Sequence, residues 1–195
     1  MKRALLTFLL CACTSNADVR QDIADSLWAA ATSSNIDVRV LYTIAKTESD
    51  FQPYIISFLT SDTGLIKKLR AGFKGSIYRF RSAKYNSSKY AVSISSNSKE
   101  AMLELAKFFW DFDFNVDFGL MQISKQNLKK DELEFIFDPQ YNVSKSKEIL
   151  ALCAGRYSSA KDAIECYNKG FAAKKNYDYY ARFMNYFDSF FGEGK

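Results

Sequence analysis

The segment from Leu41 to Pro53 constrains this chain most, because it predicts a helix with an acid on its apolar face. Three apolar residues and one acid follow the spacing i, i+3, i+4 and i+7: Leu41, Ile44, Ala45 and Glu48. This spacing places all four side chains on one side of a helix. Pro53 cannot continue a helix and restricts the residue before it, so the helix should end between residues 49 and 51. The sequence therefore predicts Glu48 at the end of a helix, where the core meets solvent.

An acid in this position has two interpretations. Partial burial raises the pKa of a carboxyl group, because a medium of low dielectric constant disfavours the charged form. A Glu that stays protonated near neutral pH can donate a proton to a leaving oxygen, as a catalytic acid does. In the alternative, Glu48 extends past the helix end into solvent and has no chemical role. The rest of the chain has to decide between the two.

The composition favours one helical domain and excludes some kinds of active site. A chain of 195 residues is long enough for a domain with a core, and 48% hydrophobic residues argue against disorder. Only 2 Pro and 8 Gly favour helices over a fold with many turns. The chain has no His, which excludes Ser-His-Asp and Cys-His catalysis and His-ligated zinc. Acid–base chemistry is left to Asp, Glu, Tyr and Lys, and no metal or organic cofactor is implied.

The N-terminus has the features of a signal peptide over residues 1–17. Two basic residues, a short apolar stretch and a small-x-small cleavage pattern at residues 15–17 follow one another. The apolar stretch is too short for a permanent membrane span. A second interpretation is a lipoprotein modified at Cys13. In both cases the mature chain, residues 18–195, is expected outside the cytoplasm, in the periplasm or secreted, with no stable transmembrane segment.

Two cysteines remain after removal of the predicted signal peptide, Cys153 and Cys166. In an oxidising compartment, two cysteines at this spacing favour a disulfide. The bond would stabilise the fold by about 3 kcal/mol, because it restricts the unfolded chain. A pair of buried free thiols is the alternative.

Most of the mature chain follows a helical pattern. Helices are expected at residues 18–33, 37–48, 98–110, 139–155, 159–170 and 177–190. Ser or Asp residues precede some of these helices as caps, and Gly170 ends one of them. Residues 113–124 are expected to form a loop that leads into a short helix near Ser124. No internal repeat or linker divides the chain.

Residues 58–97 differ from the rest in charge and in pattern. They contain eight basic residues and a single acid, Asp62. Polarity alternates over residues 76–81 and 89–95, which predicts a β-hairpin with a basic surface. We interpret the hairpin as one wall of a cleft for an anionic polymer. A solvated insertion is the alternative, and the export signal argues against nucleic-acid binding.

Three short motifs follow one another along the chain: Glu48-Ser49, Gly119-Leu120-Met121-Gln122 and Tyr167-Asn168-Lys169-Gly170. In this order they resemble the soluble lytic transglycosylase family, whose members cleave bacterial peptidoglycan with a lysozyme-like fold. The resemblance extends over about residues 36–180. Residues from Asn115 to Ser124, together with Asp138-Pro139 and Asn142, are similar to the branch attached to type IV secretion machines.

The resemblance implies a mainly α (α+β) fold, a lysozyme-like helical domain with a small β-hairpin insertion at residues 58–97 flanking the cleft. It implies that Glu48 is the catalytic acid and that Ser57 orients the acetamido group of the substrate. The other residues implied for the sugar-binding groove belong to the second and third motifs: Gly119, Met121, Gln122, Tyr167 and Asn168.

The reaction implied is cleavage of the β-1,4 bond between MurNAc and GlcNAc with formation of 1,6-anhydro-MurNAc and without water. The partners implied are peptidoglycan glycan strands and, for the secretion branch, components of a secretion or conjugation apparatus. Two other functions stay open. If Asp50, Asp113 or Asp117 faces Glu48, a lysozyme-type hydrolysis becomes possible. The last possibility is a non-enzymatic peptidoglycan-binding assembly subunit, although a retained half-buried Glu48 argues against it.

Overall fold

The computed structural model describes residues 11–171 and 176–192, with side chains from Asp18 onward. The α-helices in these ranges are α1 (Cys11–Thr32), α2 (Val38–Ser49), α3 (Thr63–Gly72), α4 (Lys99–Trp110), α5 (Pro139–Arg156), α6 (Ala160–Lys169) and α7 (Asp178–Phe191). The strands are β1 (Ile55–Thr60), β2 (Arg79–Lys84), β3 (Tyr90–Ser95), β4 (Val116–Phe118) and β5 (Ile123–Ser124). Two 3-10 helices, η1 (Lys125–Asn127) and η2 (Lys130–Phe135), follow β5.

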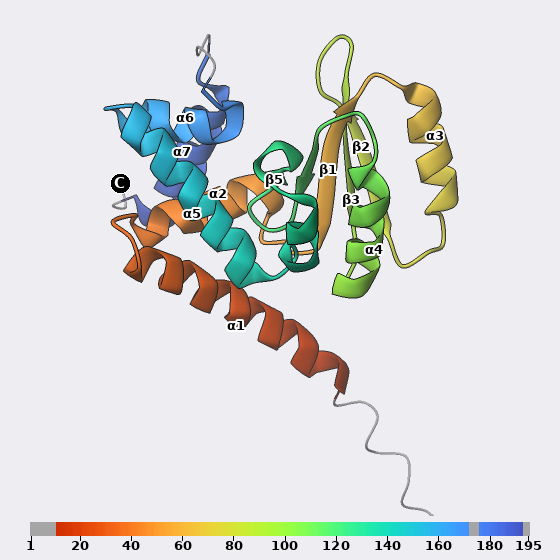
Figure 1. The fold of residues 1–195 in the computed structure, drawn as a ribbon, viewed down its shortest axis with the longest axis horizontal. Coiled ribbons are helices and arrows are strands. Elements are labelled where there is room, and N and C mark those ends of the chain that lie inside the picture. Colours follow the sequence, from red (N-terminus) through yellow and green to blue (C-terminus); the bar gives the residue numbers. More distant parts are fainter. Residues whose placement is uncertain (1–10, 172–175, 193–195) are drawn as a thin grey trace, which may run out of the picture.

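The strands form one antiparallel sheet in the order β2-β3-β1-β4-β5 (Figure 1). Alternate residues of the three inner strands point into the core and are buried: Ile56, Phe58, Val92, Ile94, Val116 and Phe118. Helix α4 packs on this apolar face, where the rings of Phe58 and Phe109 lie 5.3 Å apart. Helix α3 lies beside the edge formed by β2 (Figure 1). The opposite, polar face carries a row of polar cross-strand partners: Arg81, Ser93, Ser57, Asp117 and Ser124.

The remaining helices form the other part of the molecule (Figure 1). Helix α2 packs against α1 and α7 and leads directly into the sheet. Leu41, Ile44 and Ala45 are fully buried on α2, which confirms the helix predicted from their spacing. Helices with a small antiparallel sheet confirm the mainly α fold class and its hairpin. Within the described ranges, no helix combines the length and hydropathy that a membrane crossing requires.

The predicted helices are confirmed, with shifts at their ends. Four of them begin where the sequence places a polar cap: Asp37, Ser98, Asp138 and Ser159 each accept a hydrogen bond from a backbone N–H of the helix they start. Helix α1 is longer than expected, because it begins at Cys11 rather than at Asp18. Residues 1–10 of the predicted signal peptide lie outside the described residues, so the structure does not test that prediction.

Two parts of the sequence prediction are wrong or incomplete. Residues 113–124 are not only a loop but contain strands β4 and β5, joined by a turn in which Gly119 has a φ of 77°, while the short helix expected near Ser124 is the 3-10 helix η1, whose N-cap is Ser124. A short apolar run has no period long enough to separate a helix from a strand. The basic segment at residues 58–97 contains the predicted hairpin, but also the second half of strand β1 and all of α3, whose N-cap is Asp62.

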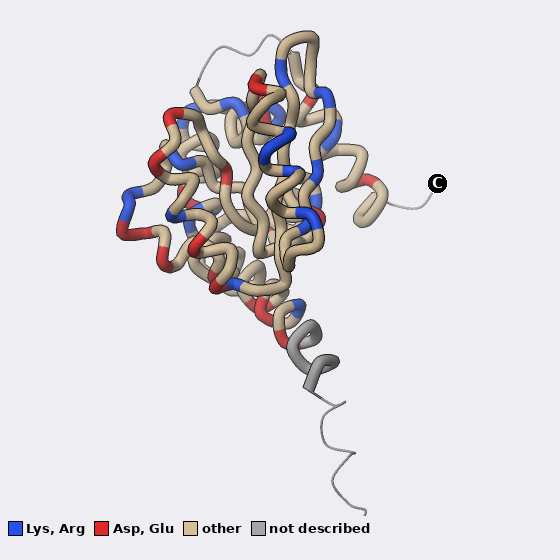
Figure 2. Tube along the Cα trace, turned by 90° about the vertical axis from the view of Figure 1, so that its right-hand side faces the viewer, with Lys and Arg blue, Asp and Glu red and all other residues tan. Residues whose placement is uncertain are grey.

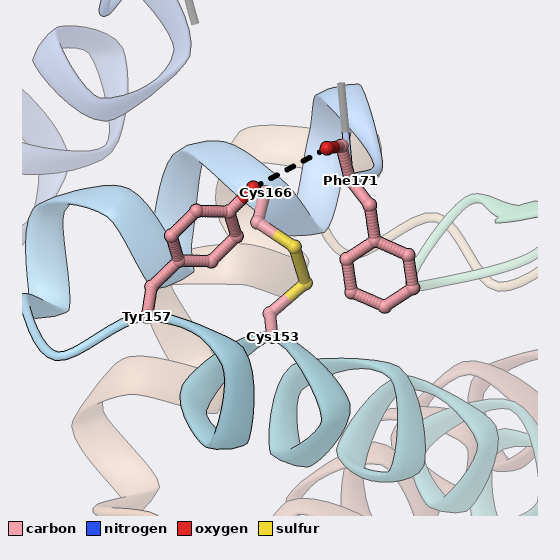
Figure 3. Close-up of a disulfide and its surroundings, with 4 residues drawn as sticks. All are labelled: Cys153, Tyr157, Cys166 and Phe171. Atoms are coloured by element: carbon pink, nitrogen blue, oxygen red, sulfur yellow. Dashed lines mark hydrogen bonds between the residues drawn. A yellow bond between two sulfur atoms is a disulfide. The ribbon is translucent and has the colours of Figure 1, made fainter. Parts of the chain in front are cut away.

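The predicted disulfide is present and joins α5 to α6 (Figure 3). The Cα atoms of Cys153 and Cys166 are 5.8 Å apart, and both cysteines are buried. Beside the disulfide, the Tyr157 hydroxyl donates a hydrogen bond to the carbonyl oxygen of Phe171 at 3.4 Å. The disulfide therefore fixes α6, the helix that carries the third sequence motif.

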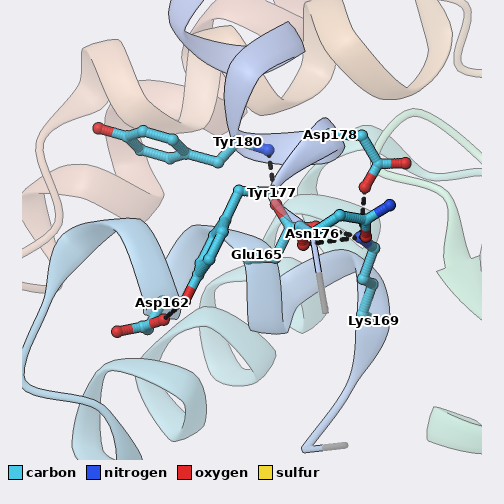
Figure 4. Close-up of polar contacts among 7 residues, drawn as sticks. All are labelled: Asp162, Glu165, Lys169, Asn176, Tyr177, Asp178 and Tyr180. Atoms are coloured by element: carbon cyan, nitrogen blue, oxygen red, sulfur yellow. Dashed lines mark hydrogen bonds and ion pairs between the residues drawn. The ribbon is translucent and has the colours of Figure 1, made fainter. Parts of the chain in front are cut away.

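A buried carboxylate fixes helix α7 against α6 (Figure 4). Glu165 is fully buried, and its Oε2 accepts a hydrogen bond from the backbone N–H of Tyr180 at 2.7 Å. Its Oε1 forms an ion pair with Lys169 Nζ at 2.5 Å, and Lys169 also contacts Asp178. Helix α7 has no side-chain cap of its own at Tyr177, so Glu165 satisfies an N-terminal N–H that would otherwise lack a partner. This contact positions the helix that lies opposite α2.

Candidate active site

Glu48 lies in the last turn of α2, where the sequence predicts it. The helix ends at Ser49, and Asp50 and Phe51 follow with φ values of 55° and 60°. The left-handed turn is closed by the Asp50 N–H, which points to the carbonyl oxygens of Ala45 and Lys46. Positive φ is unusual for residues other than Gly, so this turn is a strained connection between the Glu48 helix and strand β1.

The surroundings of Glu48 keep a proton on it near neutral pH. Burial raises its pKa from 4.5 to about 7, because the protein interior disfavours the charged form. The Tyr179 hydroxyl and the Arg182 guanidinium act in the opposite direction and lower the pKa. The negative charge of Asp117 raises it further. Glu48 can therefore both donate and accept a proton within the ordinary pH range.

Tyr179 brings a buried hydroxyl to Glu48 from helix α7. Its side chain is 1% exposed, and its hydroxyl has no hydrogen-bond partner of standard geometry among the described residues. It is close enough to lower the pKa of Glu48, so the contact between them is an imperfect hydrogen bond. In turn, burial and the negative charge of Glu48 raise the pKa of Tyr179 well above its usual value. Tyr179 is thus a neutral donor aimed at the acid.

Asp117 is a second carboxyl group at the site. It lies on β4, directly across from Ser57 on β1. Burial raises its pKa to about 6, while hydrogen bonds from Asn115 and Ser124 act to lower it. The other two acids considered from the sequence are exposed, and Asp50 forms an ion pair with Lys46. Of the three acids, Asp117 is therefore the one whose negative charge acts on the pKa of Glu48.

The Gly-Leu-Met-Gln motif forms a tight turn that is hydrogen-bonded to the side chain of Asn142 of α5. Asn142 is 1% exposed, and its Oδ1 accepts a hydrogen bond from the Met121 N–H at 2.7 Å. Its Nδ2 donates to the carbonyl oxygens of Phe118 and Ile136, at 3.1 and 2.8 Å. A Cβ atom at Gly119 would lie 2.4 Å from Asn142 Nδ2, so only glycine fits there. The turn presents Gln122 toward β1.

Ser57 and Gln122 meet on the polar face of the sheet. The Ser57 hydroxyl donates a hydrogen bond to Gln122 Oε1, and Gln122 Nε2 donates to the carbonyl oxygen of Gly119 at 2.8 Å. The Tyr167 hydroxyl of α6 donates to the carbonyl oxygen of Met121 at 2.7 Å. Burial and the negative charge of Glu48 raise the pKa of Tyr167, which places this hydroxyl near the acid as well.

A groove of about 900 Å³ joins these groups. It is bounded by the end of α2, by the polar face and outer edge of the sheet, and by α7. Glu48, Ser57 and Gln122 line it, together with four basic side chains: Lys46, Arg70, Arg81 and Arg182. The basic hairpin is thus one wall of the groove that contains the acid, as the charge pattern predicts.

Comparison with known proteins identifies the family. Residues 26–188 match the Transglycosylase SLT domain. The chain belongs to this family. No curated protein and no solved structure matches the chain significantly. Family membership gives the SLT domain a lysozyme-like fold and indicates a lytic transglycosylase-type enzyme acting on peptidoglycan.

The structure brings together most of the residues that the sequence singles out in this SLT domain. Glu48, Ser57 and Gln122 line one groove, and Tyr167 lies beside it. Met121 does not line the groove, because its side chain is 0% exposed and packs in the core. Asn168 is exposed and is not among the groove-lining residues.

Two residues of α7, Tyr179 and Arg182, are missing from the sequence prediction. They lie on the same face of α7, three residues apart, and both act on the pKa of Glu48. The aromatic pattern of this helix indicates only a packing surface, so no local signal identifies them. Their role depends on where α7 docks.

Proposed function

We propose that this SLT domain is a peptidoglycan lytic transglycosylase that cleaves the β-1,4 bond between MurNAc and GlcNAc and leaves a 1,6-anhydro-MurNAc end. The observation that carries the proposal is Glu48, a carboxyl group with a pKa of about 7 that lines a groove of about 900 Å³. Family membership supports the substrate class. The geometry supports Glu48 as the group that moves the proton.

In the proposed reaction, protonated Glu48 donates its proton to the glycosidic oxygen, and the bond from that oxygen to the anomeric carbon breaks. The acetamido oxygen of the substrate stabilises the positive charge that develops on the anomeric carbon. The Glu48 carboxylate then takes the proton of the C6 hydroxyl, and the C6 oxygen bonds to the anomeric carbon. Glu48 is protonated again, and no water is consumed. A pKa near 7 suits a group that must act first as acid and then as base.

The groups around Glu48 have distinct proposed roles. Ser57 and Gln122 form a hydrogen-bonded pair on the groove floor that is suited to orient the acetamido group. Tyr179 stabilises the carboxylate after it has given up its proton, because its hydroxyl is a donor with no other partner of standard geometry among the described groups. Tyr167 positions the turn through the carbonyl oxygen of Met121.

Lysozyme-type hydrolysis is a second candidate, and Asp117 is the observation that favours it. Most glycoside hydrolases use two carboxyl groups, one on each side of the bond that is cleaved. Asp117 is half-buried and interacts with Glu48 electrostatically. Mass spectrometry of the products decides between the two reactions, because a transglycosylase releases anhydro ends and a hydrolase releases reducing ends.

The decisive experiment is the Glu48→Gln variant on purified sacculi. We expect release of soluble fragments to fall by about 10²–10⁴-fold, which is the usual contribution of a general acid. The control is Asp113→Asn, which also removes one carboxylate but from an exposed position outside the groove. Unchanged lysis by the Glu48 variant would reject this assignment, whereas absence of lysis by the wild type would favour the non-enzymatic wall-binding subunit.

The place of action follows from the substrate. Peptidoglycan lies outside the cytoplasm, which agrees with the signal peptide predicted over residues 1–17 and with an enzyme in the periplasm or secreted. We further propose that the enzyme opens the wall locally for a secretion or conjugation apparatus, on the strength of the sequence motifs around Gly119. Loss of apparatus assembly on deletion, with rescue by the wild-type chain but not by the Glu48→Gln variant, tests this role.

A further inference from the structure

One wall of the groove carries positive charge that is not neutralised by an acid. Arg70 of α3 and Arg81 of β2 both line the groove. Neither forms an ion pair within the part of the chain that the structure describes. Figure 2 shows basic residues gathered on the side of the molecule that carries α3 and the hairpin. The acids that line the groove are Glu48 and Asp50, and Asp50 is paired with Lys46.

Arg70 is held in place without losing its charge or most of its donors. Its Nη2 donates to the Ser82 hydroxyl at 2.7 Å, and its guanidinium lies 5.5 Å from the centre of the Phe80 ring. A guanidinium has five N–H donors, and the Ser82 contact uses one of them. The remaining donors suit the two oxygens of a carboxylate, which an arginine binds with two parallel hydrogen bonds.

Arg81 lies in the same cross-strand row as Ser57 and Asp117. Direct cross-strand partners share one face of a sheet, and one row of partners crosses all the strands: Arg81, Ser93, Ser57, Asp117 and Ser124. Neighbouring strands are about 4.8 Å apart, so the Cα atoms of Arg81 and Ser57 are separated by roughly 10 Å. A sugar bound at Ser57 therefore has a cation about three peptide residues away along the groove.

We propose that Arg70 and Arg81 bind the carboxylates of the stem peptides on the glycan strand, so that peptide-bearing glycan is the preferred substrate. The inference rests on the proposed function, which puts MurNAc beside Glu48. The stem peptide branches from the lactyl group of that sugar, and an extended peptide of three or more residues reaches about 10 Å or further. In peptide-bearing glycan the lactyl carboxyl group is taken up by the amide bond to the stem peptide, so the free carboxylates are those of the peptide.

The test compares two substrates, intact sacculi and glycan strands freed of peptides by an amidase. We expect wild-type protein to have a higher kcat/KM on peptide-bearing glycan. The double variant Arg70→Gln, Arg81→Gln should lose about three- to tenfold in kcat/KM on that substrate and keep its activity on peptide-free strands. The control Lys84→Gln, Lys89→Gln removes two charges from the same hairpin at positions that do not line the groove, and should change neither value.

Two results would overturn the proposal. One is equal cleavage of both substrates by the wild type. The other is a loss in the arginine variant that is the same on both substrates, or that the lysine control reproduces, since general attraction to a polyanion would then explain it. Thermal unfolding of both double variants checks that they remain folded.

A binding measurement separates this proposal from the proposed function. In the Glu48→Gln background, where cleavage is not expected, binding to intact sacculi is measured by cosedimentation and binding to the peptide-free glycan strands by isothermal titration calorimetry. The arginine pair should weaken binding to intact sacculi only. If the wild type cleaves neither substrate, the proposed function fails, while binding still decides whether the arginines recognise peptide. Equal binding by the arginine variant would reject peptide recognition even if cleavage is confirmed.

Discussion

Glu48 and Asp117 illustrate how one site gives two carboxyl groups different roles. Burial raises both pKa values, to about 7 for Glu48 and about 6 for Asp117. At neutral pH Asp117 is therefore mostly ionised while Glu48 keeps much of its proton. The charge on Asp117 helps to hold that proton. Groups whose pKa values differ in this way can be assigned as the acid and its electrostatic partner.

The pH profile of Asp117→Asn tests this coupling. The variant removes a negative charge, so the pKa of Glu48 should fall, and the alkaline limb of kcat/KM should move to lower pH. Exposed Asp113→Asn should leave the profile unchanged. A limb that stays in place would show that the two acids are not coupled. Complete loss of activity at every pH would favour hydrolysis, with Asp117 as the second catalytic carboxylate.

The stability of Glu48→Gln tests burial of the acid independently of activity. In the unfolded chain the Glu48 pKa returns to its ordinary 4.5, so the wild type loses stability as pH rises from there to about 7. The glutamine of the variant carries no charge at any pH. The variant should therefore match the wild type below pH 4.5 and exceed it by up to about 3 kcal/mol at pH 8. Urea unfolding at both pH values measures the difference, and a variant less stable at pH 8 would contradict the burial.

At the scale of elements, the turn after β4 positions the groove floor. Asn142 of α5 binds two backbone groups of this turn and the carbonyl oxygen of Ile136, and Gly119 leaves the space for it. The turn then directs Gln122, at φ 47°, toward Ser57. In the same way, Glu165 of α6 binds the first turn of α7 and so positions Tyr179. In both places a buried polar side chain of one helix fixes a neighbouring segment.

Gly119→Ala should destabilise the fold by about 2–4 kcal/mol. Alanine would have to adopt the left-handed backbone conformation of this position, which costs about 1–2 kcal/mol. Its methyl group would also displace Asn142 from buried hydrogen bonds. Gly155→Ala is the matched control, since Gly155 is exposed on α5 with no atom in the way. That change should be neutral or stabilise by up to about 1 kcal/mol. Chemical denaturation of both variants makes the comparison, and equal stability would contradict the packing described for Asn142.

At the scale of the whole molecule, the site is assembled from three regions far apart in sequence. Helix α2 supplies Glu48, the sheet supplies Ser57 and Asp117, the turn between β4 and β5 supplies Gln122, and the C-terminal helices supply Tyr167 and Tyr179. The groove exists because the sheet with its basic hairpin stands opposite the helices (Figure 1). The disulfide holds α6 in this assembly.

Replacement of Cys153 and Cys166 by Ser should lower the free energy of unfolding by about 2–4 kcal/mol. The cysteines are 13 residues apart in sequence, and a bond that closes a loop of this size restricts the unfolded chain by about 3 kcal/mol. Thermal unfolding with and without reductant measures the effect: reductant should lower the Tm of the wild type and leave that of the double variant unchanged. A wild-type Tm that is insensitive to complete reduction would contradict a stabilising role.

The sequence by itself determined the structural features that depend on residues close together in the chain. The apolar spacing and the cap at Asp37 define α2, Pro53 follows its end, and the three motifs identify the family and name Glu48. Alternation predicted the hairpin because its strands are long enough to show a period. Strands β4 and β5 are too short for that, so the sequence predicted a loop where they lie.

Only the tertiary structure decided which groups surround the acid. Met121 belongs to a motif of the family but is buried, whereas Asp117 was one of three comparable acids until the register of β1 and β4 placed it at the site. Tyr179 reaches Glu48 because Glu165 and the disulfide fix α6 and α7. The pKa of an acid depends on burial and on charges brought close in space, and neither quantity can be read from residues that are distant in sequence.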